Sequence, residues 1–388
     1  MRVRGPRVLL TSVLGTASLC LAVPAALAAE WSAEGRMTAD LEHHSNLQLE
    51  ATDPLNVTGA LIGLTGTLGL RTESQEFTAL PRMLLRRYDG AENLDANDYS
   101  LLMNYNLGGD STRWHLDGTV ANESTLTTEL EDTGLVDVQK RRESIALNGA
   151  VDWAATERDV VTLQAGDQSD HYIDAASSGL IDYDYAGAML AFNHSIDERT
   201  SFGARVSGGS MHPAELVPVS HDVAARLTFM RQFSPAYRLN LEAGVSRADS
   251  QGLADDGTVY LLDLVRTGLL TDWSFSASRE VVPSGAGSLT RREEGGFTIS
   301  RRLAPLWHVA LSLRHLLSEE LQGSQRGSER NYDRAELSCE WRLAEYWSLS
   351  GAVSYATQSY NHDPAPTTDD LTYGIGLIWT PPRKAMSR

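Results

Sequence analysis

The stretch ESIALNGAVDW, from Glu143 to Trp153, alternates between two kinds of side chain along its whole length. Its apolar positions are Ile145, Leu147, Gly149, Val151 and Trp153, and its intervening positions are Ser144, Ala146, Asn148, Ala150 and Asp152. A period of two is the period of a β-strand, because successive side chains of a strand point to opposite faces of the sheet. One face of this segment suits lipid and the other suits water, as expected of a strand in a transmembrane barrel.

The same alternation recurs along the chain, and two kinds of connection separate the alternating segments. It returns over residues 114–120, 237–245, 307–313 and 371–379. Short turns are indicated at 108–110, 156–158, 197–199, 234–236, 304–306 and 344–346, and longer acidic or Gly/Pro-containing loops at 123–141, 211–219, 250–257 and 360–370. Short periplasmic turns and longer extracellular loops are typical of bacterial outer-membrane barrels.

The number of alternating segments predicts an all-β, up-and-down antiparallel barrel of about eighteen strands. Sixteen strands are the alternative, because the alternation is irregular over residues 76–88 and 259–271. An even number of strands places both ends of the barrel segment in the periplasm. A barrel of this size is too wide for side chains alone to fill, so we expect a water-filled or plugged lumen.

All eight tryptophans fall at one edge of this predicted barrel. They are Trp31, Trp114, Trp153, Trp273, Trp307, Trp341, Trp347 and Trp379. An indole ring prefers the interface between membrane and water, whereas the core tryptophans of a soluble β-sandwich would not share one depth. The arrangement therefore predicts a periplasmic aromatic girdle. A second, outer girdle is expected from tyrosines nearer the long loops, among them Tyr88, Tyr99, Tyr172, Tyr183 and Tyr360.

Residues 1–28 have the three parts of a secretory signal peptide. The basic start MRVRGPR precedes an apolar run over residues 8–23, and the small-residue site Ala26-Leu27-Ala28 follows. The apolar run is shorter than the roughly 20 residues of a transmembrane helix. We therefore expect cleavage after Ala28, localisation in the outer membrane of a Gram-negative bacterium, a barrel over 29–380 and a periplasmic tail over 381–388.

Charge and cysteine content exclude several classes of function. The net charge of −18 argues against nucleic acid as a partner. Cys20 lies in the predicted signal peptide, so Cys339 is left alone and we expect no intrachain disulfide. No EF-hand spacing appears, and we expect neither a metal ion nor a cofactor.

The predicted inward faces of the strands carry many charges. The candidates for lining the lumen are Arg71, Arg82, Arg113, Asp117, Arg205, Arg226, Arg238, Glu242, Arg314, Glu336 and Glu340. Arginine has a planar fork of donors that matches carboxylate and phosphate groups, so these residues suit a pathway for an acidic sugar or polysaccharide. The alternative is that the charges pair across strands and only keep the lumen wet.

A short motif near the first strand raises an enzymatic alternative. His43-His44-Ser45-Asn46 has the His-x-Ser-Asn spacing of outer-membrane lipid hydrolases, and His43 and Ser45 would share the lipid-facing side of a strand. No G-x-S-x-G nucleophile elbow supports this reading, and a barrel of about eighteen strands is larger than those hydrolases use. We therefore expect no enzymatic activity, with an acyl hydrolase using His43 and Ser45 as the alternative.

Four segments carry a resemblance to a known family. They are EHHSNL at 42–47, SREVVPSGAGSL at 278–289, RLAPLW at 302–307 and RLAEYW at 342–347. On these residues the chain resembles the uncharacterised porin-like outer-membrane β-barrels often encoded in Gram-negative exopolysaccharide and exosortase gene clusters. The resemblance implies a porin-like channel with a role in export or surface assembly of an exopolysaccharide. A structural or adhesive barrel with a plugged lumen is the alternative.

The expected partners follow from this location. They are outer-membrane lipid and lipopolysaccharide, the barrel-assembly machinery and, with the exopolysaccharide role, polysaccharide export proteins.

Overall fold

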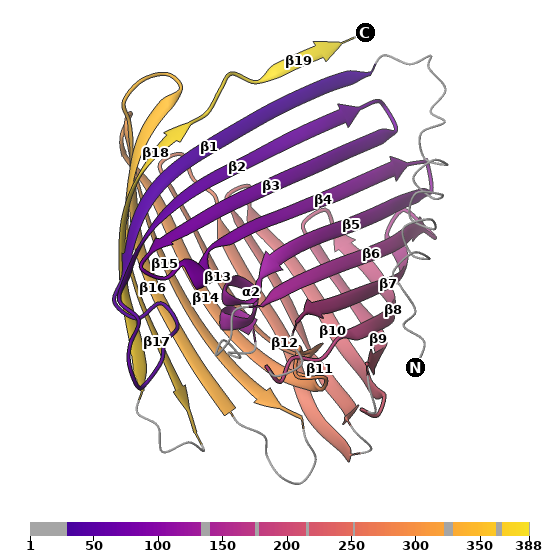
Figure 1. The fold of residues 1–388 in the computed structure, drawn as a ribbon. Coiled ribbons are helices and arrows are strands. Elements are labelled where there is room, and N and C mark those ends of the chain that lie inside the picture. Colours follow the sequence, from indigo (N-terminus) through magenta and orange to yellow (C-terminus); the bar gives the residue numbers. More distant parts are fainter. Residues whose placement is uncertain are drawn as a thin grey trace, which may run out of the picture.

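The computed structural model describes residues 29–132, 140–174, 178–214, 217–250, 253–321, 329–361 and 367–387. The predicted signal peptide over 1–28 lies outside these residues. The described chain forms a closed antiparallel barrel in which each strand pairs with its neighbours in sequence (Figure 1). The eighteen strands of the wall are the number that the sequence predicts.

The strands are β1 (Glu30–His44), β2 (Val57–Arg71), β3 (Gln75–Asp89), β4 (Ala96–Gly108), β5 (Thr112–Ser124), β6 (Arg141–Ala154), β7 (Asp159–Ile173), β8 (Tyr183–Asp197), β9 (Thr200–Pro213), β10 (Ser220–Ser234), β11 (Tyr237–Ser250), β12 (Leu253–Arg266), β13 (Thr271–Pro283), β14 (Leu289–Ala304), β15 (Trp307–Glu320), β16 (Glu329–Arg342), β17 (Trp347–Tyr360), β18 (Thr368–Trp379) and the short β19 (Lys384–Ser387). Two short helices lie in the connections, η1 (Glu92–Leu94) and α2 (Thr125–Asp132).

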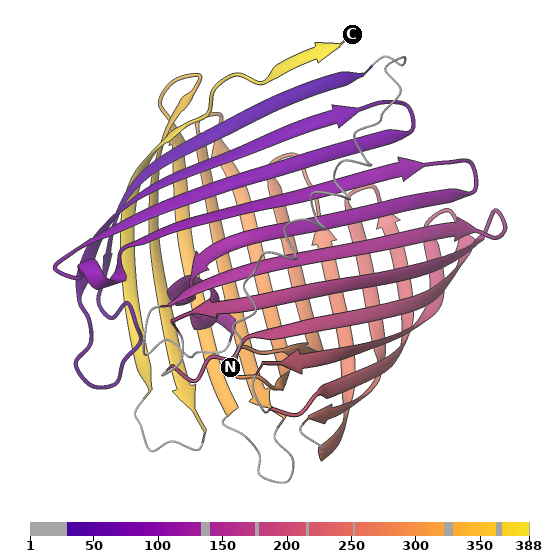
Figure 2. The ribbon, with the colours of Figure 1, turned by 45° about the vertical axis from the view of Figure 1, so that its right-hand side comes forward.

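The seam of the barrel lies between β1 and its two partners from the far end of the chain. β18 pairs with the second half of β1, from Met37 opposite Trp379 to His44 opposite Thr372. β19 pairs with the first residues of β1, over Glu30–Ala33. Residues 384–387, within the predicted tail, are therefore a strand that extends the seam (Figure 2).

The connections differ at the two ends of the barrel. At one end all eight hairpins close with short turns, including the six indicated by the sequence and two more at 72–74 and 267–270. The long connections gather at the other end, at the bottom of Figure 1. The loop expected over 250–257 is wrong, because β11 and β12 remain paired as far as Ser250 opposite Leu253.

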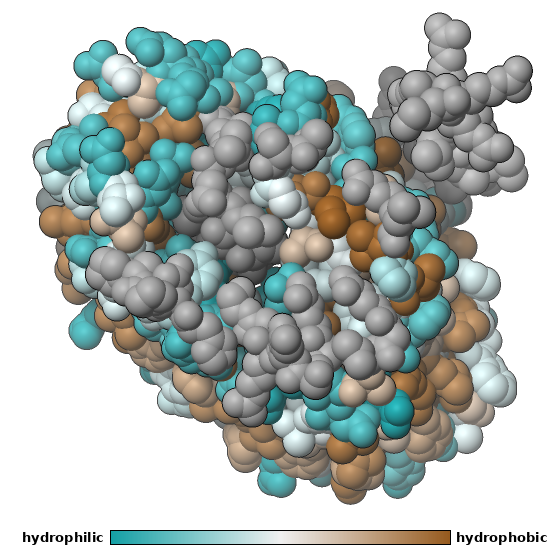
Figure 3. Space-filling view, turned by 60° about the horizontal axis from the view of Figure 1, so that its bottom comes forward, coloured by the Kyte–Doolittle hydropathy of each residue, from teal (hydrophilic) through white to brown (hydrophobic). Residues whose placement is uncertain are grey.

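The outer face of the barrel is apolar, and the inner face is polar. Exposed large side chains such as Leu147, Leu163, Leu190 and Val206 lie on the outer face of neighbouring strands. Hydrophobic residues occur along the outer flank in the view from the long-connection end (Figure 3). No helix of the described residues is long and apolar enough to cross a membrane.

Three clusters of buried apolar side chains pack inside the barrel where the long connections meet. One consists of Leu47, Val57, Tyr88, Ala91, Leu94 and Leu126, and a second of Leu49, Leu316 and Tyr332. The third, which we call the inner seal, consists of Tyr172, Leu180, Tyr183, Met211, Ala248, Leu289 and Leu321. The long connections therefore fold inward and narrow this end of the lumen.

The expected outer girdle of tyrosines is wrong at most of its positions. Tyr88, Tyr172 and Tyr183 are at most 5% exposed, because each occupies an inward position of its strand and packs in an inner cluster. Tyr360 lies near the inward-facing Gln358 and accepts a hydrogen bond from its amide. Of the five, Tyr99 is the exposed one, on the outer face.

Candidate functional site

The register of the strands places all the charged residues proposed to line the lumen on the inward face. The positions are Arg71, Arg82, Arg113, Asp117, Arg205, Arg226, Arg238, Glu242, Arg314, Glu336 and Glu340. Each alternates along its strand with an outward apolar neighbour, for example Arg226 beside the exposed Leu227. The inner wall is thus a polar surface formed by residues from the whole length of the chain.

Several of these charges form ion pairs. Arg314 Nε of β15 donates to Glu294 Oε1 of β14 at 2.9 Å, whereas Glu336 pairs within its own strand, with Oε2 2.9 Å from Arg334 Nη2. Glu340 Oε2 lies 4.0 Å from Arg36 Nη2. The contact between Arg314 and Glu294 agrees with the cross-strand pairing considered from the sequence, and such partly exposed pairs stabilise a fold only weakly.

One group of charges shares a single carboxylate, and we call its two arginines the arginine pair. Arg205 of β9 lies directly opposite Arg226 of β10, as Arg314 of β15 lies opposite Arg334 of β16, although like charges in that position repel each other. Both guanidinium groups contact one oxygen, Oε2 of Glu242, at 2.6 and 3.7 Å. The Nε atoms of both arginines are buried and have no hydrogen-bond partner among the described residues.

Beside the arginine pair, the barrel wall is hollowed into a recess of about 350 Å³. Its floor follows a row of three inward glycines on adjacent strands, since Gly166 pairs with Gly187 and Gly187 with Gly209. Gly166 and Gly187 line the recess directly, and Tyr185 lies over Gly209. The ring of Tyr185 lies across this floor, because a Cβ atom built on Gly209 would stand 2.0 Å from the Tyr185 hydroxyl. Any larger residue at Gly209 would displace that ring.

Polar side chains surround the glycine floor. Asn148 and Asp222 stand at the two ends of the row, opposite Gly166 and Gly209 respectively. The Tyr185 hydroxyl donates to Asp222 Oδ1 at 3.0 Å. Gln164, Gln168, Ser207 and Ser246 also line the recess, together with Arg205 and Arg226. Ser246 is 6% exposed, and its hydroxyl has no hydrogen-bond partner among the described residues.

The β13–β14 hairpin covers the recess. β12 pairs with β13 only as far as Tyr260 opposite Arg279, so the part of the hairpin beyond Arg279, near its connection, leaves the wall. Its connection crosses to the β7–β8 connection, where the Ile181 amide donates to the Gly285 carbonyl at 2.8 Å. Val281 lines the recess, and Leu289 packs in the inner seal. The recess therefore lies directly beside the inner seal.

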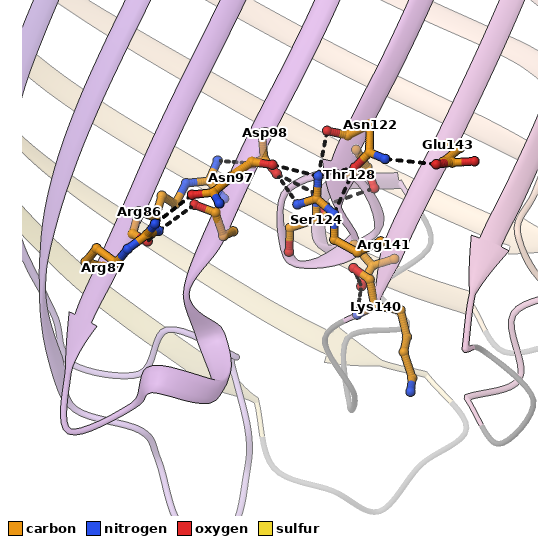
Figure 4. A network of polar contacts seen from close by, with 12 residues as sticks. Arg86, Arg87, Asn97, Asp98, Asn122, Ser124, Thr128, Lys140, Arg141 and Glu143 are labelled. Atoms are coloured by element: carbon orange, nitrogen blue, oxygen red, sulfur yellow. Dashed lines mark hydrogen bonds and ion pairs between the residues drawn. The ribbon is translucent and has the colours of Figure 1, made fainter.

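The β5–β6 connection is anchored by a polar network centred on Asp98 of β4 (Figure 4). Asp98 Oδ1 accepts hydrogen bonds from the Ser124 amide at 2.8 Å and from Arg141 Nη1 at 2.9 Å. Arg86 lies 3.3 Å from the other carboxylate oxygen. Since Ser124 ends β5 and Arg141 begins β6, one buried carboxylate fixes both ends of the connection that carries α2.

Helix α2 is joined to the inner seal by the buried carboxylate of Glu129. Glu129 is 1% exposed and accepts a hydrogen bond from the Tyr172 hydroxyl at 2.9 Å. Arg142 lies 3.6 Å from Glu129 and donates to Asp170 Oδ1 at 2.8 Å. The helix thus lies inside the barrel against β6 and β7, and nothing in the alternation pattern indicates it.

The geometry does not bring His43 and Ser45 together as a base and a nucleophile. His43 faces outward, where its ring lies 4.9 Å from that of Tyr373 and its Nδ1 is 3.0 Å from Thr58 Oγ1. β1 ends at His44, and the Ser45 hydroxyl donates to Asp370 Oδ1 at 3.2 Å. The expectation that both share the lipid-facing side of one strand is wrong, because Ser45 lies beyond the strand end.

The eight tryptophans all occupy outward positions near the short-turn end of their strands. Trp114, Trp273, Trp307 and Trp347 stand within the first three residues of a strand, and Trp153, Trp341 and Trp379 within the last two. The rings of Trp307 and Trp341 stack with centroids 5.3 Å apart. Trp31 is the second residue of β1.

Closure of the wall, its apolar outer face and its charged inner face together define a transmembrane β-barrel of the outer-membrane type. Among the described residues, no group of three His, Cys, Asp or Glu side chains is placed to hold a metal ion. Cys339 is a free thiol on the outer face of β16.

Comparison with known proteins shows a similarity in fold to solved structures and nothing further. No model of a protein family matches the sequence, and no curated protein matches it. Solved structures that are similar include the outer membrane protein OpdK of Pseudomonas aeruginosa, with 11% identity, a TM-score of 0.47 and coverage of 91% of this chain and 99% of that chain. OccK2 (OpdF) of the same organism, in complex with glucuronate, has 10% identity, a TM-score of 0.48 and coverage of 90% and 98%. OccK5 (OpdH) has 9% identity, a TM-score of 0.46 and coverage of 90% and 98%.

Proposed function

We propose that the protein is a porin-like, non-enzymatic channel that passes small anionic solutes across the bacterial outer membrane, to which a cleaved signal peptide delivers it. The observation that carries the proposal is the arginine pair on the inner wall. Two guanidinium groups face the lumen and share a single carboxylate oxygen of Glu242, so arginine donors line the wall where a solute would pass. Guanidinium groups on the wall of an aqueous pathway attract anions.

The inward-folded connections favour small solutes over bulky ones. α2, the β13–β14 hairpin and the inner seal all occupy the lumen at the long-connection end. A wall of eighteen strands would otherwise leave a wide aqueous channel. We therefore expect a conductance well below that of an unobstructed barrel of the same strand number.

Single-channel recording from purified protein in planar bilayers tests this function. The expected result is discrete current steps and, in a salt gradient, a reversal potential on the anion-selective side. Complete absence of current at every voltage would contradict the channel and favour the second candidate, a structural or adhesive barrel with a plugged lumen. That candidate is supported by the same packed clusters at the long-connection end.

A role in export or surface assembly of an acidic exopolysaccharide is the finer form of this proposal. Its support is the sequence resemblance at 42–47 and 278–289, together with inward arginines that suit polymer carboxylates. In this role polysaccharide export proteins would be partners, in addition to lipopolysaccharide around the barrel and the barrel-assembly machinery. Deleting the gene and measuring surface uronic acid tests it: unchanged surface polysaccharide would contradict the export role and leave the channel standing.

The hydrolase alternative has a direct test in Ser45→Ala. We expect purified wild-type protein and the variant to show the same background release of fatty acid from phospholipid and from lipid A. Activity that is present in the wild type and lost in Ser45→Ala would contradict a non-enzymatic barrel.

A further inference from the structure

We propose that the recess beneath the β13–β14 hairpin is a binding site for a sugar acid, with the carboxylate held by Arg205 and Arg226. This inference rests on the proposed function only in that the ligand must reach the lumen. It adds a specific site, a chemical class of ligand and a role for each part of the recess.

The arginine pair supplies the carboxylate site. Two guanidinium groups directly opposite each other on adjacent strands destabilise the wall unless an anion lies between them. Glu242 contacts both guanidinium groups through a single oxygen, and Asp222 lies on the same inward face of β10 as Arg226. Each arginine has five N–H donors in a planar fork, and their Nε groups are buried without a partner. A ligand carboxylate in the recess would meet the guanidinium groups of both arginines, which line it.

The rest of the recess is suited to hydroxyl groups. A sugar hydroxyl is both a donor and an acceptor, and side-chain amides and hydroxyls offer both functions. Asn148, Gln164 and Ser246 line the recess, and the buried Ser246 hydroxyl is unpartnered.

The glycine floor provides the space and a flat aromatic surface. Because Gly187 and Gly209 lack side chains, the Tyr185 ring lies against the wall instead of projecting into the lumen, and the Asn148 side chain lies over Gly166 in the same way. The ring therefore lines the recess as a platform whose hydroxyl is fixed by Asp222. The volume of about 350 Å³ lies at the lower end of the range of roughly 300–1,000 Å³ for small-molecule sites, which fits one monosaccharide.

The experiment is a calorimetric titration of the full-length mature barrel in detergent with three matched probes. Galacturonate has both the carboxylate and the hydroxyls, galactose lacks the carboxylate, and cyclohexanecarboxylate lacks the hydroxyls. We expect galacturonate to bind at least tenfold more tightly than either of the others. Equal affinity for galacturonate and cyclohexanecarboxylate, or no heat from galacturonate, would overturn the proposal.

Variants assign the binding to the recess. Arg205→Gln and Arg226→Gln should each weaken galacturonate binding by roughly tenfold or more, since each removes a charge-assisted pair of hydrogen bonds. Arg226→Lys keeps the charge but loses the fork, and should also weaken binding. Arg314→Gln, the same change on the inward face of β15 outside the recess, should leave the dissociation constant unchanged. An equal loss in Arg314→Gln would overturn the assignment.

Folding of each variant is checked by the gel mobility shift between unheated and heated protein.

The ligand could be a free sugar acid or a residue of an acidic polymer, and titrating trigalacturonate distinguishes the two. Weaker binding than that of the monomer indicates a free sugar acid, and tighter binding indicates a polymer. Failure of the channel is distinguishable from failure of the site. Current steps without galacturonate binding leave the channel standing and remove the site, whereas binding without current leaves the site and removes the channel.

Discussion

Arg205 and Arg226 face each other across β9 and β10 and share a single oxygen of Glu242, at 2.6 and 3.7 Å. This arrangement makes Glu242 the carboxylate that contacts both arginines. The carboxylate of Glu242 therefore has two effects: it holds the arginines in place, and it offsets part of their charge.

We expect Glu242→Gln to make the channel more anion-selective and the barrel less stable. The amide keeps the shape of the side chain but no longer neutralises either guanidinium group. Breaking such a partly buried pair costs about 1–3 kcal/mol. Reversal potentials in a salt gradient and urea unfolding in lipid vesicles measure the two effects. A reversal potential identical to that of the wild type would contradict a role of this group in selectivity.

Shortening the β13–β14 connection should widen the lumen. Replacing residues 284–288 with Asn-Gly leaves a two-residue hairpin turn and removes the contact between Ile181 and Gly285. We expect single-channel conductance to rise several-fold with the strand content unchanged by circular dichroism. Unchanged conductance would mean that this hairpin does not limit the flow of ions.

A disulfide can test directly that the hairpin lies inside the barrel. A Cβ atom at Gly287 would stand 3.3 Å from Cβ of Ile181, close to the separation of about 3.5–4.5 Å in disulfides. In a Cys339→Ser background, Ile181→Cys with Gly287→Cys should therefore cross-link on oxidation in the folded protein. The positive φ of 77° at Gly287 will make the bond strained and readily reduced. Each single-cysteine variant should show no intramolecular cross-link.

The seam between β1 and β18 should depend on Asp370. Its carboxylate accepts hydrogen bonds from the Asn46 amide at 2.8 Å and the Ser45 hydroxyl at 3.2 Å, and it lies 2.9 Å from His44 Nδ1. Asp370→Ala leaves these groups unsatisfied, at a cost of about 2–4 kcal/mol. We expect faster amide exchange at Asn46 and a lower temperature for loss of the unheated gel mobility. Asp369→Ala, at the adjacent outward and exposed position, is the matched control.

The alternation of side chains predicts about eighteen strands, the number that the barrel has, and it predicts a face for each charge. Both depend on local parity, which the sequence displays directly at Leu227 and Arg226. The prediction of an outer tyrosine girdle did not use this parity. Tyr172 and Tyr183 stand at inward positions of their strands, so counting parity from the outward Leu163 and Leu190 assigns them to the interior.

The recess could not be predicted, because it depends on register between strands. Gly166, Gly187 and Gly209 lie 21 and 22 residues apart in sequence, and only the pairing of β7, β8 and β9 brings them into one row. The inward lean of the β13–β14 hairpin likewise follows from long-range packing of Leu289, and the segment 278–289 gives no local sign of it. What the sequence does show is one glycine at an inward position on each of β7, β8 and β9.

The pairing of β19 with Glu30–Ala33 has a consequence for aggregation. Those four residues are bonded to β2 on one side, and without β19 they would offer unsatisfied amides and carbonyls on the other. Such an edge is a template on which a strand of a second molecule can add. The short strand over Lys384–Ser387 therefore shields the barrel from edge-to-edge association at its short-turn rim.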